Sequence, residues 1–255
     1  MRILDLAGIG RADTVLEIGP GTGALTDFLL KNAGFVTALE FDRDMVKLLG
    51  EKYQDAVTSS PPRLLIHQEN VLKSDWGQLL PFPGPGSARP AKIVGNLPYN
   101  IATRILEHSI RFKSLFQSFT FMTQKEVAMR IQAAPGSADY GYFTLLMDFN
   151  FQRIRGFDVP PGAFFPPPKV MSHVMQLRPL FRETGNEFLA LARQAFSQRR
   201  KTLFNNLKPL FPETGRLSSI LAECGIPERS RPQELSLEQF LAISDASRGM
   251  LSFKA

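Results

Sequence analysis

An asparagine and a tyrosine flank a leucine–proline pair in the stretch GNLPY, residues 95–99, at the end of a predicted strand. A connection that only turned the chain would need glycine and proline, but not an amide and an aromatic ring beside them. The Asn96 side-chain oxygen and the carbonyl of Leu97, held extended because Pro98 follows, are two hydrogen-bond acceptors. Tyr99 adds a flat face. These groups together could orient an exocyclic amine and stack a planar base.

A glycine-rich turn lies earlier in the chain, between a predicted strand and a predicted helix, in the sequence VLEIGPGTGALT. Gly19, Gly21 and Gly23 follow the spacing G-x-G-x-G, and their missing side chains allow a ligand to approach the backbone. Glu40 ends the next predicted strand, 21 residues after Gly19. A carboxylate at that place can accept both hydroxyl groups of an adenosine ribose. The two features predict a ligand that contains adenosine.

Two classes of ligand fit an adenosine held in this way, a dinucleotide and S-adenosylmethionine. A dinucleotide places its pyrophosphate at the helix N-terminus, but here Glu17 precedes the turn and Pro20, which lacks an N–H, lies inside it. A carboxylate is favourable beside a sulfonium and an ammonium group and costly beside a pyrophosphate. The turn therefore favours S-adenosylmethionine. After the third predicted strand, Asn70 is expected to accept from the adenine amine, and the Val71 N–H to donate to a ring nitrogen.

With this cofactor bound over the strand ends, GNLPY would face the methyl group. The amine of adenine is a poor nucleophile because its lone pair is delocalised into the ring. An enzyme must therefore take the base out of its stack and hold the amine in line with the methyl group. The residues predict methylation of an adenine amine.

The elements that position these residues alternate between short β-rich runs and helical stretches, from Thr14 to about Phe151. The predicted strands are residues 14–19, 35–41, 63–68, 92–96 and 116–124, and the predicted helices are residues 23–33, 43–53 and 102–112. This alternation predicts a doubly wound α/β fold, with a mostly parallel sheet covered by helices on both faces. The Pro/Gly-rich residues 81–91 are expected to form an exposed loop.

The composition changes near residue 180, where Phe188, Ala192 and Phe196 follow a helical spacing. We therefore expect a methyltransferase domain over residues 1–179 and a small helical domain over residues 180–255. The formal net charge is +6, and residues 178–255 contribute 12 basic minus 8 acidic side chains, or +4. This asymmetry suggests a polyanionic partner for the helical domain.

The cysteine and histidine content argues against two classes of protein, those held by disulfides and those with a metal site. Cys224 is the single cysteine and the three histidines are widely spaced, so we predict neither a disulfide framework nor a metal site. The chain begins without the pattern of a signal peptide and contains no long apolar run, so we expect a cytoplasmic protein without a membrane span.

The chain also resembles a known family, the ribosomal RNA adenine dimethyltransferases. The resemblance covers nearly the whole sequence and rests on the motifs VLEIGPGTGALT, GNLPYNIAT, MTQKEVAMRI, PGSADYG, VPPGAFFPPPKVMS and FSQRRKTLFNNL, in the family's order. It implies that S-adenosylmethionine supplies two methyl groups to N6 of adenosine in ribosomal RNA.

The resemblance also implies roles for particular residues. The cofactor would be held by Glu17 to Gly23, Glu40, Asn70, Val71 and Asn96. The target adenine would be held by Asn96, Leu97 and Tyr99, with Phe164 as a second stacking face. Arg199, Arg200 and Lys201 would lie on a helix and contact RNA phosphates.

Two features depart from the family's pattern. Asn70 stands where the family usually has Asp, so the adenine amine would meet a neutral acceptor. Relatives also carry some tens of residues at the front, with a Gln-x-Phe-Leu segment that lies over the cofactor, and this chain starts after that segment. On this basis we expect poorly ordered first residues and an affinity for S-adenosylmethionine near that for adenosine.

Four functions are compatible with these features of the sequence. The first is dimethylation of small-subunit ribosomal RNA during ribosome assembly, by a monomer that acts on the small-subunit precursor. The alternatives are a large-subunit RNA methyltransferase of the macrolide-resistance kind, a DNA adenine methyltransferase, and an RNA-binding assembly factor without turnover. The motif VPPGAFFPPPKVMS argues against the second by resemblance, and a DNA enzyme would need a base-reading domain for which residues 178–255 leave little room.

Overall fold

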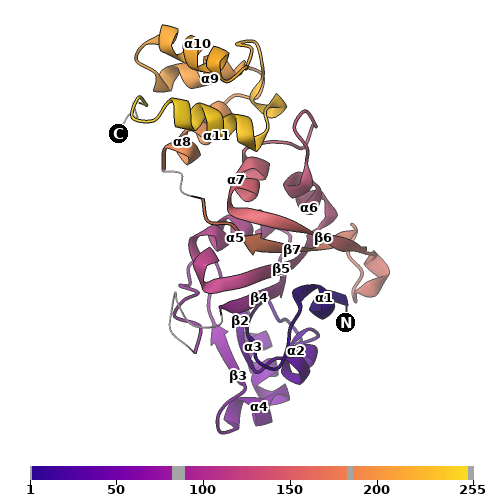
Figure 1. Cartoon of the computed structure of the whole chain (residues 1–255). Helices are drawn as coiled ribbons and strands as arrows, with labels where there is room; N and C mark the ends of the chain where they lie inside the picture. Colours follow the sequence, from indigo (N-terminus) through magenta and orange to yellow (C-terminus); the bar gives the residue numbers. More distant parts are fainter. Residues whose placement is uncertain (1, 82–89, 183–185, 252–255) are drawn as a thin grey trace. The chain divides into compact units, whose positions relative to one another are not determined.

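The structure is a computed structural model that describes residues 2–81, 90–182 and 186–251. The chain divides into two compact units (Figure 1). The first, which we call the α/β unit, comprises Met1–Ala128 and Phe151–Pro179. The second, the helical unit, comprises Met129–Asn150 and Leu180–Ala255.

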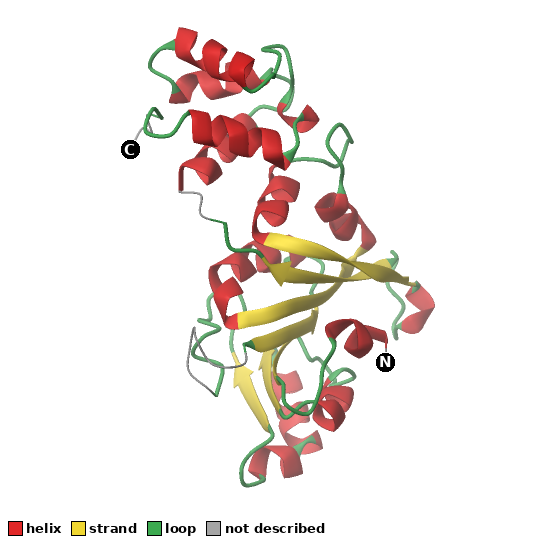
Figure 2. Cartoon of the chain, viewed as in Figure 1, coloured by secondary structure: helices red, strands yellow, loops and turns green. Residues whose placement is uncertain are grey.

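The described residues of the α/β unit form one seven-stranded sheet in the order β3-β2-β1-β4-β5-β7-β6. Its strands are β1 (Thr14–Ile18), β2 (Phe35–Glu40), β3 (Leu64–Gln68), β4 (Ala91–Asn96), β5 (Phe116–Gln124), β6 (Phe151–Val159) and β7 (Ser172–Pro179). Strands β1 to β5 pair in parallel, and β7 pairs antiparallel with both β5 and β6. Figure 2 shows them as one continuous twisted sheet.

This sheet confirms the predicted doubly wound α/β fold. The strand order runs outward from β1 in two directions, which makes the gap between the carboxyl ends of β1 and β4 the switch point where ligands bind in such folds. Both strands are almost completely buried, as expected for central parallel strands with helices on each face. The antiparallel pair β6 and β7 was not predicted, because β6 is a sheet-edge strand whose apolar residues are interrupted by two arginines, a glycine and an aspartate.

Helices accompany the parallel strands. They are α1 (Arg2–Ala7), α2 (Thr26–Asn32), α3 (Arg43–Lys52), α4 (Gln54–Thr58), α5 (Ala102–Ser109) and α6 (Lys125–Gln132), with 3-10 turns η1 (Ile110–Leu115) and η2 (Pro161–Ala163). Asp42 caps α3 by accepting from the N–H groups of Asp44 and Met45. Buried Leu29 of α2 and Leu49 of α3 belong to one hydrophobic cluster with β1, β2 and β3.

The expectation that the first residues would be poorly ordered is wrong. They form α1, in which Leu4 and Ala7 are buried. Gln176 on β7 donates from its side-chain amide to the Leu6 carbonyl at 2.6 Å. Burial of the apolar residues and this long-range hydrogen bond hold the helix in place.

The helical unit contains α7 (Tyr142–Asn150), α8 (Asn186–Ala195), α9 (Leu203–Leu207), α10 (Thr214–Glu223) and α11 (Leu237–Ala246), with 3-10 turns η3 (Lys208–Leu210) and η4 (Pro232–Glu234). Its core includes Phe149 of α7 stacked on Phe188 of α8, with ring centroids 4.3 Å apart. The boundary that we expected at residue 180 coincides with the end of β7. Because of contacts such as this stack, the structure also groups residues 129–150 with the C-terminal helices.

Of residues 81–91, for which we expected an exposed loop, 82–89 lie outside the described residues. Among the described residues, no helix is long and apolar enough to cross a membrane.

Candidate active site

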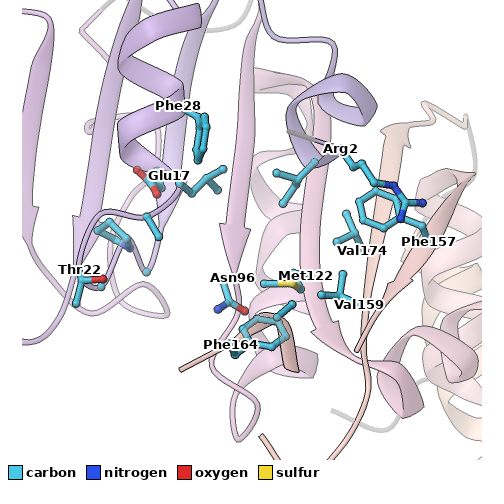
Figure 3. Close-up of a pocket in the computed structure, with 17 residues that line it drawn as sticks. Arg2, Glu17, Thr22, Phe28, Asn96, Met122, Phe157, Val159, Phe164 and Val174 are labelled. Carbon is cyan, nitrogen blue, oxygen red and sulfur yellow. The ribbon is translucent and has the colours of Figure 1, made fainter. Parts of the chain in front are cut away.

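A cavity of about 580 Å³ opens at the switch point of the sheet. Figure 3 shows the side chains that line it. They come from the ends of β1 and β4, the glycine turn, helices α1 and α2, strands β5, β6 and β7, and the segment after η2. The lining residues are Arg2, Ile3, Glu17, Gly19, Pro20, Gly21, Thr22, Ala24, Leu25, Phe28, Asn96, Met122, Phe157, Val159, Ala163, Phe164 and Val174. This volume suits a small-molecule ligand.

The three predicted glycines are needed at their positions for different structural reasons. Gly19 has a φ of +65°, and a Cβ there would lie 3.3 Å from the Asn96 carbonyl oxygen, so the residue lets the β1 turn approach the end of β4. Gly21 lines the cavity. Gly23 does not line it, and a Cβ at this position would collide with the Tyr53 ring, whose hydroxyl donates to the Gly23 carbonyl at 2.8 Å. The third glycine is therefore required by packing against Tyr53, the residue that follows α3.

Glu17 is a buried carboxyl group on the wall of the cavity, with 1% of its surface exposed. Its Oε2 accepts from the Thr26 hydroxyl at 2.7 Å, and its Oε1 has no hydrogen-bond partner among the described residues. Burial raises the pKa of Glu17 to about 7, and Asp27 and Glu40 add to this while the Thr26 hydrogen bond opposes it. A buried acceptor without a donor is costly, so the site is suited to a ligand that brings a donor or a positive charge.

Replacing Glu17 with Gln is expected to stabilise the free protein, and more so at pH 8 than at pH 5. In the unfolded chain the pKa of the Glu17 carboxyl group is about 4.5, but in the folded protein it is about 7. Folding therefore becomes less favourable as the pH rises between these values. The free energy of unfolding of the wild type should fall by about 2 to 3 kcal/mol over that pH range.

Chemical denaturation at both pH values measures this difference in the free energy of unfolding. Glu51→Gln, at an exposed position on α3, is the matched control. A gain for Glu17→Gln that is the same at both pH values would contradict the prediction.

Glu40 lies at the end of β2 and is fixed by three backbone N–H groups. Its Oε2 accepts from Gly21 at 3.1 Å, and its Oε1 accepts from Phe41 at 2.8 Å and Asp42 at 3.0 Å. The carboxylate thus connects the glycine turn to the end of the neighbouring strand. Glu40 does not itself line the 580 Å³ cavity.

Asn70 and Val71 follow β3 at the same edge of the sheet. The Asn70 side-chain oxygen, which we expected to accept from adenine, accepts from the Leu72 N–H at 2.9 Å. An amide oxygen has a second lone pair, so this local bond leaves one acceptor site. The Val71 N–H has no acceptor among the described residues. Neither residue lines the cavity.

Sequence reasoning missed Phe41, which directly follows Glu40 and is 70% exposed at the end of β2. Such an exposed ring is suited to stack on a planar group. Its signal in the sequence was an aromatic residue directly after the acid that ends a strand. The apolar far wall of the cavity, with Met122, Val159 and Val174, was also missed, because these residues look like ordinary core positions.

The structure brings part of the GNLPY motif to the cavity. The exposed Asn96 side chain lines it, and Figure 3 shows Asn96, Met122 and Phe164 on the same side of the cavity. Leu97 is buried and its N–H donates to the Met122 carbonyl at 2.9 Å, while among the described residues no group donates to its own carbonyl. Tyr99 is half-buried and does not line the cavity, and its hydroxyl lies 2.8 Å from the Ser172 hydroxyl.

The expected helical position of Arg199, Arg200 and Lys201 is wrong. Helix α8 ends at Ala195, and the three exposed residues lie in the turn before α9. Buried Asn206 explains the break: its side-chain amide donates to the carbonyls of Ala195 and Gln198, at 2.6 and 3.0 Å, which satisfies the end of α8.

The three basic residues also differ in their contacts. The Arg199 guanidinium donates to the carbonyls of Ala138 and Tyr140, at 2.7 and 3.4 Å. Its role in the helical unit is thus to hold the PGSADYG loop. Arg200 and Lys201 are the cations of this cluster that remain for a partner in the described structure.

Comparison with known proteins identifies the family of the chain. The sequence model described as "Ribosomal RNA adenine dimethylase" matches residues 1–248. The chain belongs to this family. The resemblance drawn from the motifs is thereby confirmed, and the family spans both compact units.

Curated relatives carry the name "Ribosomal RNA small subunit methyltransferase A". The protein of Aromatoleum aromaticum is 39% identical over 249 residues, covering 96% of this chain and 87% of the relative. The protein of Geobacter sulfurreducens is 37% identical over 258 residues, covering 98% and 90%.

Solved structures show the same fold. A dimethyladenosine transferase from Plasmodium falciparum has a TM-score of 0.82 at 25% identity, covering 99% of this chain and 96% of that one. The 23S rRNA methyltransferase ErmE has a TM-score of 0.68 at 25% identity, covering 96% and 95%. The methyltransferase fold with a helical C-terminal part is therefore common to this chain and both structures.

Proposed function

We propose that this chain transfers methyl groups from S-adenosylmethionine to N6 of adenosines in small-subunit ribosomal RNA, two per adenosine, in the cytoplasm during ribosome assembly. The observation that carries the proposal is a single cavity that joins a buried, partly unsatisfied carboxyl group, Glu17, to the Asn96 side chain of GNLPY. The names of the curated relatives support the choice of the small subunit.

The residues of the cavity fit S-adenosylmethionine. The unpartnered Oε1 of Glu17 would receive the positively charged methionine end, and Gly19 and Gly21 leave the backbone open to the ligand. Glu40 would accept from the ribose, while Asn70 and the Val71 N–H, which has no acceptor in the described part of the chain, would meet the adenine edge. The cofactor would supply an electrophilic methyl group.

The target adenine would be held on the other side of the cavity. The Asn96 side-chain oxygen and the Leu97 carbonyl would accept from the N6 amine and fix its orientation. Tyr99 and Phe164 would stack on the two faces of the extruded base. Methyl transfer from the sulfonium leaves the N6 nitrogen as an ammonium group, which is acidic and loses its proton to water, so a side chain with a specially tuned pKa is not required.

Transfer of a labelled methyl group from S-adenosylmethionine to small subunits, large subunits and DNA tests the proposal. Label recovered as dimethyladenosine in small-subunit RNA alone is the expected result. Label in large-subunit RNA would favour the activity named for ErmE, and binding to small subunits without label would favour an assembly factor that does not turn over.

The basic cluster should contribute to RNA binding through Arg200 and Lys201. Changing both to Ala is expected to reduce the slope of log affinity against log salt by about 1.4 to 1.8, since each lost phosphate contact removes about 0.7 to 0.9. Arg199 is left in place because its change would also release the carbonyls of Ala138 and Tyr140.

Binding of an RNA substrate at several salt concentrations measures the slope. The control removes two exposed cations of α3 by the changes Arg43→Ala and Lys47→Ala. An unchanged slope in the Arg200 and Lys201 variant would mean that these side chains are only solvated.

A further inference from the structure

The tyrosine of GNLPY is tied to a strand far away in the sequence. Its hydroxyl lies 2.8 Å from the hydroxyl of Ser172, the first residue of β7. Ser172 is completely buried, with 0% of its surface exposed, whereas Tyr99 is half-buried. One end of this hydrogen bond therefore belongs to the interior of the sheet and the other to a surface connection.

Ser172 is paired on both sides at the start of β7. Its backbone pairs with Gln124 of β5 on one side and Val159 of β6 on the other. Val174, two residues further along β7, lies on the same face of the strand and lines the cavity, as does Val159. The Ser172 hydroxyl is thus carried by a backbone that is paired on both sides, next to the cavity wall.

Tyr99 has no such support from its own element. It lies in the turn between β4 and α5, where the neighbouring anchors are the Leu97 N–H on the Met122 carbonyl and the Ile101 N–H on the Pro98 carbonyl. Those bonds hold the backbone on either side of Tyr99 but not its ring. Among the described residues, Ser172 is the hydrogen-bond partner of the Tyr99 side chain.

We propose that Ser172 is a positioning residue for base stacking: it holds the Tyr99 hydroxyl so that the ring is already oriented when the target adenine enters. The inference rests on the proposed function, because it assigns the ring of Tyr99 to the adenine. A ring held in place loses less side-chain freedom when the base stacks on it, which favours the stacked state.

The variants Ser172→Ala, Tyr99→Phe and their combination test this role, since Phe keeps the ring and removes only the hydroxyl. Ser118→Ala is the matched control. Ser118 is also a buried serine on a strand of the same sheet, but its hydroxyl has no hydrogen-bond partner among the described residues.

Each single change is expected to lower kcat/KM for the RNA by about 3- to 10-fold, the worth of one hydrogen bond. The double variant should be no worse than either single variant, because the second change removes a bond that is already lost. The affinity for S-adenosylmethionine and the kinetics of Ser118→Ala should stay within about twofold of wild type.

A fluorescent base gives a readout that a purely structural role would not move. An RNA with 2-aminopurine at the target position has no N6 amine to methylate and serves as a binding probe. Its fluorescence should be quenched by stacking in the wild type, and quenched less by both single variants. Losses that multiply in the double variant, or unchanged quenching in Ser172→Ala, would overturn the inference.

The wild-type reaction separates this inference from the proposed function. If the wild type does not methylate small-subunit RNA, the proposed function fails before any variant is compared. If it does, and Ser172→Ala behaves like Ser118→Ala, the positioning role alone fails.

Discussion

Asn96→Ala is expected to lower the rate of methyl transfer by about 10²- to 10³-fold, with a change in cofactor affinity of less than about threefold. The amide would orient the adenine amine, and misplacement of a reacting group or loss of one positioning hydrogen bond typically costs that much in rate. Its contact with the cofactor would contribute much less, because Glu17, Glu40 and the glycine turn hold that ligand.

The position of Asn96 allows its side chain to be truncated without a change elsewhere in the fold. Its backbone is fixed as the last residue of β4, opposite Met122 on β5. The side chain is exposed and faces the cavity, so truncation leaves no buried void and should not affect folding.

Single-turnover kinetics with saturating RNA and calorimetric titration of S-adenosylmethionine give the two quantities. Asn100→Ala is the matched control, since Asn100 is an exposed asparagine in the same connection that does not line the cavity. Equal losses of rate and cofactor affinity in Asn96→Ala would assign this residue to the cofactor instead of the adenine.

Glu17→Gln is expected to weaken binding of S-adenosylmethionine by about 10- to 100-fold while adenosine binds within about threefold of wild type. The carboxylate would interact with the cationic methionine end, and a hydrogen bond to a charged group in a buried site is worth that range. Adenosine lacks the charged end. The same substitution should stabilise the free protein, so loss of binding could not be attributed to unfolding.

The affinity for S-adenosylmethionine should also depend on pH through Glu17. With a pKa of about 7 in the free protein, the group is protonated below that value and ionised above it. A cation binds the ionised form, so affinity should fall by about tenfold for each pH unit below 7 and level off above it.

Titrations between pH 5.5 and pH 8.5 measure this dependence. The pH profile of Glu17→Gln shows how much of the dependence comes from titration of the cofactor itself. Glu51→Gln is the control for loss of an exposed carboxylate, on α3. The same pH profile in wild type and Glu17→Gln would show that Glu17 does not interact with the charged end.

Local signals in the chain predicted the central strands and the residues near their ends. Buried apolar runs such as those of β1 and β4 predicted central parallel strands, and the glycine turn and GNLPY were found at the strand ends where ligands bind in this fold. Such signals lie within about ten residues of the chain, where backbone geometry and hydrophobic period act directly.

The environment of those residues depends on contacts that form when the chain folds. The raised pKa of Glu17 results from its burial in the folded protein, Gly23 is needed because Tyr53 packs against it, and Tyr99 is held by a serine 73 residues away. The break between α8 and α9 likewise depends on the side chain of Asn206, which folds back onto the end of α8. Tyr53 and Ser172 are distant in the sequence from Gly23 and Tyr99, which they contact. In all four cases the solvation energy or the hydrogen bond exists only once folding has brought the groups together.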